Sequence, residues 1–496
     1  MRALLRAAAL LLAVTCAVWV AVLWHWQASR RAVDADDIVL YLAVLPLAAW
    51  GLALAVRWAV RAASQRQARG ARPAAGPASG AAPVPVPATS SDPAGGEASW
   101  WLLGAWAHTA AGEGVDALRD AAAAGAPRPV PDAELLDDDG LPVLAARIAG
   151  LALPPRDALP ASADGTPVPD RVRRALACLS APLRGLAPAL AERMQDVPGG
   201  DAPDRPWAAP AGAAPQPRVL AAWPSDWSDA ACAAARDWLA DELRRHLRAC
   251  LPPAPQGVPA EAWPLPDEAI QAGRMSGSEL LASAGRLLAT LRAQDRADPV
   301  ALLACHSDLD AHAVSAPDGG GLFHPAHRPR APMAGEGAAA LLLAAAAPAA
   351  AADGPAVRCA PPAFAPPVVA DAAGAAGRAS AADTLRLVER SLAGVVPEGV
   401  VARVVGDVGQ HAAAAAELYA AALALLPALD AGADLLLAGT VTGRLGPAAA
   451  LAALALAADA ARAEGRPALA VSLGDAGGRM AAVLRPEPAG PPRADA

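Results

Sequence analysis

Histidine and aspartate residues alternate in one short segment of the chain. His306, Asp308, Asp310 and His312 are each separated by a single residue, so on an extended backbone all four side chains would project from one face. Imidazole and carboxylate groups together are a plausible ligand set for a divalent metal ion. Because the spacing matches no compact metal motif, the segment is expected to be a solvated polar loop. These residues are kept only as metal candidates, and no cofactor is predicted.

Six cysteines could supply thiolates for catalysis, metal binding or disulfides. They are scattered without a CxxC spacing, which predicts neither a zinc site nor a disulfide framework and suits a reducing compartment. Most of them are expected to be small buried hydrophobic residues. The cysteines are Cys16, Cys178, Cys232, Cys250, Cys305 and Cys359.

The composition excludes several kinds of chemistry. The 496-residue chain contains no lysine and no asparagine. Without lysine there is no Schiff-base nucleophile, no P-loop phosphate lysine and no Ser–Lys dyad. A formal net charge of −8 and a pI near 5.5 argue against a nucleic-acid partner, because such proteins carry a basic stripe.

Two apolar runs near the N-terminus predict a transmembrane hairpin over residues 1–62. Residues 7–24 form an uncharged run just long enough to cross a bilayer core of about 30 Å, and residues 38–60 form a second run. Arginines precede the first run and cluster after the second. The positive-inside rule therefore places both termini and the soluble domain in the cytoplasm, at the inner membrane.

The rest of the chain divides by composition. Residues 63–98 are rich in Pro, Ala and Gly and predict a linker that cannot bury a core. Residues 99–486 alternate short apolar runs with Ala- and Leu-rich stretches, which is typical of an α/β domain. Residues 487–496 are predicted to be a disordered tail.

Hydrophobic periodicity predicts the elements of the α/β domain. The helix expected at 446–463 is almost entirely Ala and Leu, so we expect it to be buried in a central layer with sheets on both sides. The expected strands are 100–106, 218–223, 300–305, 338–343, 400–405, 435–439, 468–473 and 481–484. The other expected helices are 114–124, 170–194, 228–250, 277–293, 380–392 and 410–428.

Five segments, in order along the chain, resemble those of the β-ketoacyl synthases. They look like the family's opening strand, loop and first helix, the segment that follows, a Gly-Glu-Gly-Ala run before a strand, a Gly-His loop with its buried helix, and a closing glycine-rich turn. The segments are 101–110 with 112–125, 141–150, 334–343, 442–453 and 472–484. The resemblance implies a thiolase-like layered α-β-α-β-α fold of two related halves, usually a homodimer.

The residue that would be this family's nucleophile is not matched. The resemblance places the nucleophilic cysteine at the start of helix 277–293, where this chain has Met275 or Ser276. Methionine cannot attack, and a serine without an adjacent base is a poor nucleophile. Ser276 is expected instead to be the N-cap of that helix, with Glu279 completing a capping box.

The family's two histidines and its lysine are also replaced. Counting back from Glu417, the first histidine aligns with Gly406, and the nearby His411 is expected to have a surface or packing role. The second histidine aligns with Arg444, and the lysine with Gly439. Decarboxylative condensation needs a thiolate and two imidazoles, so the resemblance predicts a pseudoenzyme.

Arg444 itself requires a partner. An unpaired buried guanidinium costs several kcal/mol, so a structural ion pair with a residue such as Asp407 or Asp475 is expected. The alternative is an open cavity in which Arg444 binds an anionic ligand.

These expectations describe a membrane-anchored, catalytically inactive ketosynthase-like protein that serves as a scaffold or binding partner on the cytoplasmic face of the inner membrane. Three alternatives stay open. They are an accessory subunit like a chain-length factor in a fatty-acid or polyketide condensing system, a cytoplasmic accessory of a secretion machine such as type VI, and an acyltransferase or thioesterase using Ser276 or Cys305.

The expected partners follow from these functions. They are the membrane, through residues 1–62, and a protein, namely acyl carrier protein, an active ketosynthase, or envelope or secretion components. A homodimer or a heterodimer would suit such partners.

Overall fold

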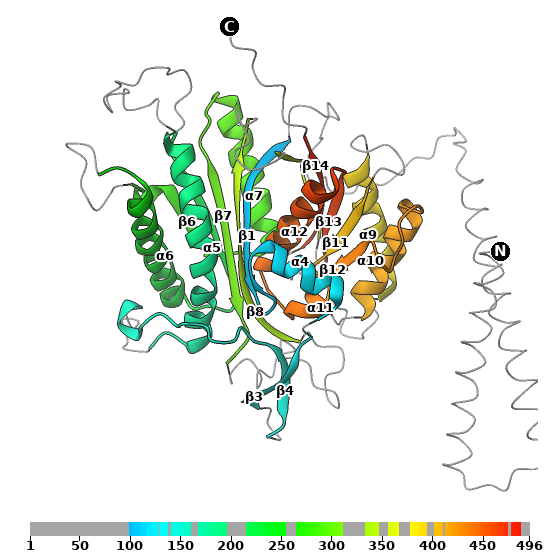
Figure 1. Ribbon diagram of the computed structural model, residues 1–496, viewed down its shortest axis with the longest axis horizontal. Coiled ribbons are helices and arrows are strands. Elements are labelled where there is room, and N and C mark those ends of the chain that lie inside the picture. The colour runs from blue at the N-terminus through cyan, green and yellow to red at the C-terminus, as the bar shows by residue number, and fades with distance from the viewer. Residues whose placement is uncertain are drawn as a thin grey trace, which may run out of the picture. The chain divides into compact units, whose positions relative to one another are not determined.

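A computed structural model of the chain describes residues 99–126, 128–136, 140–159, 167–195, 215–253, 264–310, 333–346, 356–366, 377–393, 401–409, 412–474 and 478–487 (Figure 1). The chain divides into two units, Met1–Ser91 and Asp92–Ala496. The first unit, with the predicted transmembrane hairpin, lies outside the described residues, as do the predicted linker and residues 488–496 of the predicted tail. No helix among the described residues is long and apolar enough to cross a membrane.

The strands of the described residues join in one 14-stranded sheet. Its main path runs β12-β11-β13-β14-β9-β1-β8-β7-β5-β6, and β2, β3, β4 and β10 pair at its sides. The strands are β1 (Trp100–Thr109), β2 (Gly112–Glu113), β3 (Val130–Leu136), β4 (Pro142–Ala146), β5 (Arg218–Trp223), β6 (Ile270–Arg274), β7 (Val300–Ser307), β8 (Ala334–Ala344), β9 (Val357–Cys359), β10 (Ala363–Ala365), β11 (Arg403–Gly406), β12 (Leu435–Leu437), β13 (Ala468–Ser472) and β14 (Arg479–Pro486).

The two halves of the sheet repeat one pattern. In the first half β6, β5 and β7 are parallel, and β8 runs antiparallel between β7 and β1. In the second half β12, β11 and β13 are parallel, and β14 runs antiparallel between β13 and β9. The two halves meet where β1 pairs with β9. The predicted two related halves are therefore present.

Helices separate the strands in the same order in both halves. The series α5-β5-α6-β6-α7-β7-β8 is matched by α9-β11-α10-β12-α12-β13-β14, with the short α11 inserted before α12. The helices are α4 (Val115–Ala124), α5 (Asp170–Gln195), α6 (Asp229–Cys250), α7 (Gly277–Ala293), α9 (Gly377–Leu392), α10 (Ala412–Leu425), α11 (Gly439–Thr442) and α12 (Ala448–Glu464). Single 3₁₀ turns occur at Arg156–Ala158 and Asp267–Ala269.

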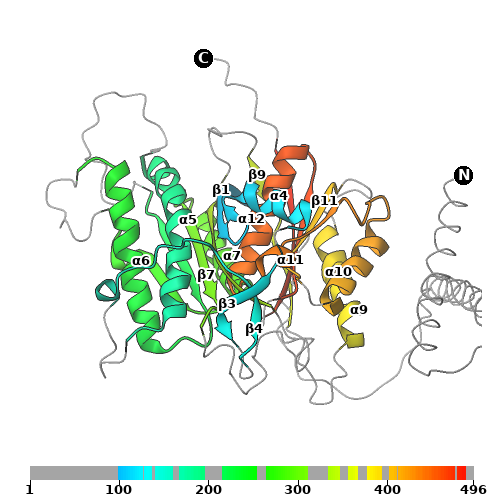
Figure 2. The same ribbon diagram turned by 60° about the horizontal axis from the view of Figure 1, so that its bottom comes forward.

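The elements stack in layers. Helices α5 and α6 lie outside one half of the sheet, α9 and α10 lie outside the other half, and α4, α7 and α12 lie between the halves (Figures 1 and 2). Helix α12 packs against β1, β7 and β8 of the first half and against β11, β13 and β14 of the second. Nearly all of its Ala and Leu side chains are buried, as expected from its apolar sequence.

A glycine allows α5 to approach β1 closely. A Cβ atom built on Gly185 would lie 2.3 Å from Trp106 Nε1, which is far inside van der Waals contact. Trp106 packs against the core between α5, α6 and the sheet. The position of α5 therefore depends on the missing side chain at residue 185.

Every predicted strand and helix is present, with changes of a few residues at the ends. The sequence pattern missed short elements, among them β6, β9 and β10. Strand β6 has only one large apolar residue, Ile270, because it lies at the end of the sheet path and pairs with β5 alone.

Candidate functional site

The start of α7 is closed by a capping box. Ser276 Oγ accepts the backbone N–H of Glu279 at 3.2 Å. Glu279 Oε2 in turn accepts the backbone N–H of Ser276 at 2.8 Å and its hydroxyl at 2.9 Å. The Ser276 hydroxyl also lies 3.1 Å from that of Ser278. The capping role expected for Ser276 is therefore present in the structure.

The side chain before this cap is Met275, which packs partly buried against the central core. Its backbone N–H donates to the carbonyl of Trp223 at 3.3 Å, which ties the start of α7 to the end of β5. Among the described residues, Ser276 has no hydrogen bond to an imidazole. The start of α7 therefore offers a thioether and a capping hydroxyl, and neither is an activated nucleophile.

Arg444 forms a buried ion pair with Asp308, at the end of β7. Arg444 Nε donates to Asp308 Oδ2 at 2.9 Å, and Nη2 donates to Oδ1. This two-point contact is the strong form of an arginine–carboxylate pair. Asp308 is 2% exposed. Burial acts to raise the pKa of Asp308, but His306 and Arg444 outweigh it and hold the pKa well below its ordinary value.

This ion pair corrects the partner expected for Arg444. Asp475 lies outside the described residues, and Asp407 binds elsewhere. The backbone N–H of Arg444 donates to the Met333 carbonyl at 3.0 Å, so the loop that carries Arg444 runs beside the start of β8. Arg444 therefore reaches the end of β7, which is 136 residues away in sequence.

His306 lies on the other side of the same carboxylate. Its Nε2 atom is 2.9 Å from Asp308 Oδ1, and the residue is 7% exposed. Neither ring nitrogen meets hydrogen-bond geometry with a partner in the described residues, and the ring packs so closely on Gly446 that a Cβ there would lie 2.5 Å from Nδ1. The alternation of His306 and Asp308 thus brings them together, but as part of an ion cluster with Arg444.

Of the two remaining metal candidates, the structure describes only Asp310. The backbone N–H of Asp310 donates to the Asp308 carbonyl at 2.8 Å, and His312 lies outside the described residues. Within the described parts of the chain, no three His, Cys, Asp or Glu residues are grouped so that they could hold a metal ion.

Close packing surrounds Gly406 and Gly439, the two glycines that were predicted from the resemblance to stand in place of a histidine and a lysine. A Cβ on Gly406, the last residue of β11, would lie 2.4 Å from Leu418 Cδ2. A Cβ on Gly439, the first residue of α11, would lie 2.4 Å from the carbonyl oxygen of Asp407. Neither backbone position has room for a longer side chain without a shift of its neighbours. His411 lies outside the described residues.

Asp407 was expected to be a partner of Arg444, but it contacts a different part of the fold. It directly follows β11, and its carboxylate binds the turn after β13: it accepts the backbone N–H of Leu473 at 2.8 Å and the hydroxyl of Ser472 at 2.5 Å. An aspartate directly after a buried strand, together with a glycine-rich turn after another, was the available signal.

Glu336, within the Gly-Glu-Gly segment, is fully buried and has a structural role. Its carboxylate accepts two N–H groups of Arg174, at 2.8 and 2.7 Å, the backbone N–H of Ile148 at 2.8 Å and the Ser307 hydroxyl at 3.2 Å. These bonds tie α5, β7 and β8 together. A buried carboxylate satisfied in this way stabilises the fold.

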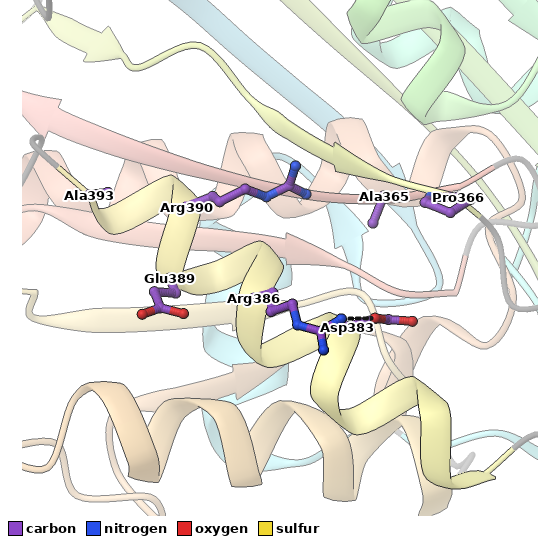
Figure 3. Close-up of a pocket in the computed structure, with 7 residues that line it drawn as sticks. All are labelled: Ala365, Pro366, Asp383, Arg386, Glu389, Arg390 and Ala393. Carbon is purple, nitrogen blue, oxygen red and sulfur yellow. Dashed lines mark hydrogen bonds and ion pairs between the residues drawn. The ribbon is translucent and has the colours of Figure 1, made fainter. Parts of the chain in front are cut away.

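A surface hollow lies away from these positions, between α9 and β10. It has a volume of about 460 Å³ and is lined by Ala365, Pro366, Asp383, Arg386, Glu389, Arg390 and Ala393 (Figure 3). Arg386 pairs with Asp383 at 3.0 Å, and Arg390 donates to the Phe364 carbonyl at 2.8 Å. Its two arginines are balanced by two carboxylates, so it has no net charge to select a ligand.

The comparisons with known proteins concern the fold. No family model and no curated protein matches this chain. Among solved structures, the ketosynthase from module 6 of the bacillaene synthase of Bacillus subtilis 168 covers 80% of this chain and 73% of its own, with 13% identity and a TM-score of 0.51.

Two further solved structures are similar at lower TM-scores. The ketosynthase from module 1 of the bacillaene synthase of Bacillus amyloliquefaciens FZB42 covers 82% of this chain and 76% of its own, with 14% identity and a TM-score of 0.49. The ishigamide ketosynthase/chain length factor covers 78% and 99%, with 20% identity and a TM-score of 0.41. The layered mixed α/β fold of the described residues is that of the thiolase-like ketosynthases.

Proposed function

We propose that this chain is a non-catalytic subunit with a ketosynthase fold, which works beside an active condensing enzyme as chain-length factors do. The observation that carries the proposal is the close packing at Gly406 and Gly439. A Cβ on Gly439 would meet the backbone carbonyl oxygen of Asp407, and a Cβ on Gly406 would meet the Leu418 side chain. This packing leaves little room for an imidazole or an ammonium group at the two positions that the resemblance aligns with the family's histidine and lysine.

The start of α7 supports the same conclusion. Condensation needs a thiolate at the N-terminus of this helix, where the helix dipole favours the anion. This chain places the capping hydroxyl of Ser276 there, and that hydroxyl already binds Glu279. Acyl transfer through Ser276 is disfavoured because no imidazole of the described residues bonds its hydroxyl, and the Glu279 carboxylate that accepts this hydroxyl is held in the helix cap.

Cys305 is a poor alternative nucleophile. It lies fully buried within β7, and burial raises the pKa of its thiol well above the ordinary value. A neutral thiol without access to substrate does not attack a thioester.

The remaining polar groups support a binding role without catalysis. The guanidinium that aligns with the second histidine is neutralised by Asp308, so it offers no free charge to an incoming malonyl or acyl group. When the polar groups of a condensing-enzyme fold bind one another in this way, the surface of the protein is the part left to bind partners. The partners proposed for this surface are an active ketosynthase and acyl carrier protein. Residues 1–62 are proposed to anchor the protein to the membrane.

The test is a mild-detergent purification of the tagged full-length protein from its native host, followed by mass spectrometry. We expect an active ketosynthase or acyl carrier protein to co-purify in constant ratio. Recovery of secretion or envelope components without either of these would contradict the proposal and favour an adaptor. In a parallel assay with acyl and malonyl carrier proteins, condensation by the purified chain alone would overturn its non-catalytic character.

A further inference from the structure

The ribbon formed by β3 and β4 carries most of the exposed large hydrophobic side chains of the described residues. Four such side chains are between 47% and 61% exposed, and three of them, Val130, Leu136 and Leu141, belong to this ribbon. The ribbon extends beyond the main sheet (Figures 1 and 2). Exposed apolar groups that are gathered in one place and bordered by polar residues mark sites of interaction.

The other side of the ribbon is fixed to the body of the domain. Leu135, Val143 and Ala145 are buried together with Leu309, which follows β7, and Ala334, which begins β8. Strand β4 also pairs with β8, with Ala145 opposite Ala334. The exposed side chains of the ribbon are therefore presented on a firm support.

The ribbon is also acidic. Residues 129–146 contain five carboxylate side chains and no arginine or lysine. Asp132 is buried and pairs with Arg147 at 2.5 Å, whereas the Glu134 side chain, 3.1 Å from Arg147, is 79% exposed. An acidic surface repels nucleic acid and anionic lipid. It complements a basic protein surface.

We propose that the outer side of this ribbon, defined by Val130, Glu134, Leu136 and Leu141 and called the ribbon surface, binds the active condensing enzyme. The complementary surface of the enzyme is an apolar depression for the two leucines, bordered by arginine or lysine side chains that face Glu134. Apolar burial supplies the affinity, and the opposite charges orient the two proteins. This inference rests on the function proposed above and names the surface that performs it.

The test measures binding of the active ketosynthase that co-purifies with the full-length protein, after each protein has been purified in mild detergent. In the triple variant Val130→Thr/Leu136→Thr/Leu141→Thr, the Kd should rise at least about tenfold, because apolar burial is lost. The Tm should stay unchanged, since these side chains are exposed in the free protein.

The charge of the ribbon surface has its own readout. Glu134→Arg should weaken binding more than Glu134→Gln, because it places a cation against a basic surface. Sodium chloride should weaken binding of the wild type. Equal binding by both Glu134 variants and the wild type would overturn the proposed charge complementarity.

The matched control is Leu423→Thr, which changes the fourth exposed large hydrophobic residue, on α10. Its Kd should equal that of the wild type. An unchanged Kd in the triple variant, or an equal loss in Leu423→Thr, would overturn the inference while the proposed function stands, since the ketosynthase still binds. Absence of a ketosynthase from the wild-type purification would instead contradict the proposed function, and this inference with it.

Two further measurements keep the inference testable. Leu141→Thr alone serves if the triple variant does not fold, because Leu141 lies outside both strands; it too should raise the Kd, and no change would overturn the inference. Sedimentation velocity detects a second copy of this chain as the occupant. A wild-type dimer that becomes a monomer in the triple variant, with ketosynthase binding unchanged, would assign the ribbon surface to that second copy and overturn the inference.

Discussion

At the scale of single residues, the cluster around Asp308 joins the loop before α12 to the end of β7. Arg444 and His306 contact one carboxylate from two sides. Separating such a pair is expensive, because the partner left behind is a buried charge without compensation. The cluster therefore fixes the loop between α11 and α12 against the end of β7.

Arg444→Ala should lower the free energy of unfolding by about 3 kcal/mol, because the buried Asp308 carboxylate would lose its two-point partner and keep only its contact with His306. Urea unfolding would measure this loss. The loss should be smaller when Arg444→Ala is made on an Asp308→Asn background, where no charge is left behind. An equal loss in both backgrounds would show that packing, and not the ion pair, explains the effect.

The stability that Asp308 contributes should depend on pH. Its pKa is lowered in the folded state, so its contribution is complete above the ordinary carboxyl pKa of about 4 and is lost as the pH falls toward the folded-state value. The difference in unfolding free energy between wild type and Asp308→Asn should therefore shrink on acidification below about pH 4. Urea unfolding at a series of pH values would measure it, and a constant difference would contradict the assignment.

Ser276→Ala should cost about 1 kcal/mol of stability, which is the usual effect of losing an N-cap. Ser276→Thr, which keeps the hydroxyl, is the matched control and should lose much less. Capture of the protein partner should be unchanged in both variants. Loss of cellular function in a Ser276→Ala protein that stays folded would support the acyltransferase or thioesterase alternative.

Local side-chain contacts could be predicted from the sequence, whereas contacts between distant segments could not. The capping box of Ser276 and Glu279 was predictable because it lies within four residues and follows a known local pattern. The partner of Arg444 was not, because Asp308 is distant in sequence and becomes a neighbour only when β7 and the loop before α12 are placed by the fold. The same holds for Asp407 and its turn.

At the scale of elements, helices and strands were predicted where hydrophobic periodicity extends over several residues. Strand β5 and helix α7 match their predicted bounds. Strands β6, β9 and β10 were missed because each is short. Each forms a strand through hydrogen bonds to its neighbour in the sheet, and its own composition shows no clear strand pattern.

The contact between α5 and β1 makes an element-scale prediction. Gly185→Ala in a helix interior would ordinarily stabilise a protein by about 1 kcal/mol, but here the new Cβ meets the Trp106 indole. We expect a net destabilisation of about 1–3 kcal/mol, as for other overpacked cores. In a Trp106→Leu background the same substitution should become neutral or stabilising. A stabilising effect in the wild-type background, seen in urea unfolding, would show that the indole moves aside.

At the scale of the whole molecule, the repeated strand order of the two halves is the feature that the sequence implied only through its resemblance. The halves differ at the positions singled out by the resemblance. In the first half α7 begins with a cap, and in the second half glycines occupy two of these positions. The resemblance identified the fold, whereas the internal pairing of its polar groups could be seen only in three dimensions.

A prediction for the whole chain concerns its predicted membrane anchor. Deleting residues 1–62 should move the protein from the membrane fraction to the soluble fraction of lysed cells, because these residues hold both apolar runs. The deletion variant should still capture its protein partner, since the ketosynthase-like fold lies beyond residue 98. A full-length protein found in the soluble fraction would contradict the predicted hairpin.

The central place of α12 also bears on how the protein is made. Strands β1, β7 and β8 are synthesised early, yet the inner face they share is covered by a helix that begins at Ala448. At about 5–20 residues per second, the first half of the sheet waits for roughly 5–25 s with that face open to solvent and to other nascent chains. Folding in the cell should therefore depend on chaperones that shield the growing chain until α12 leaves the ribosome.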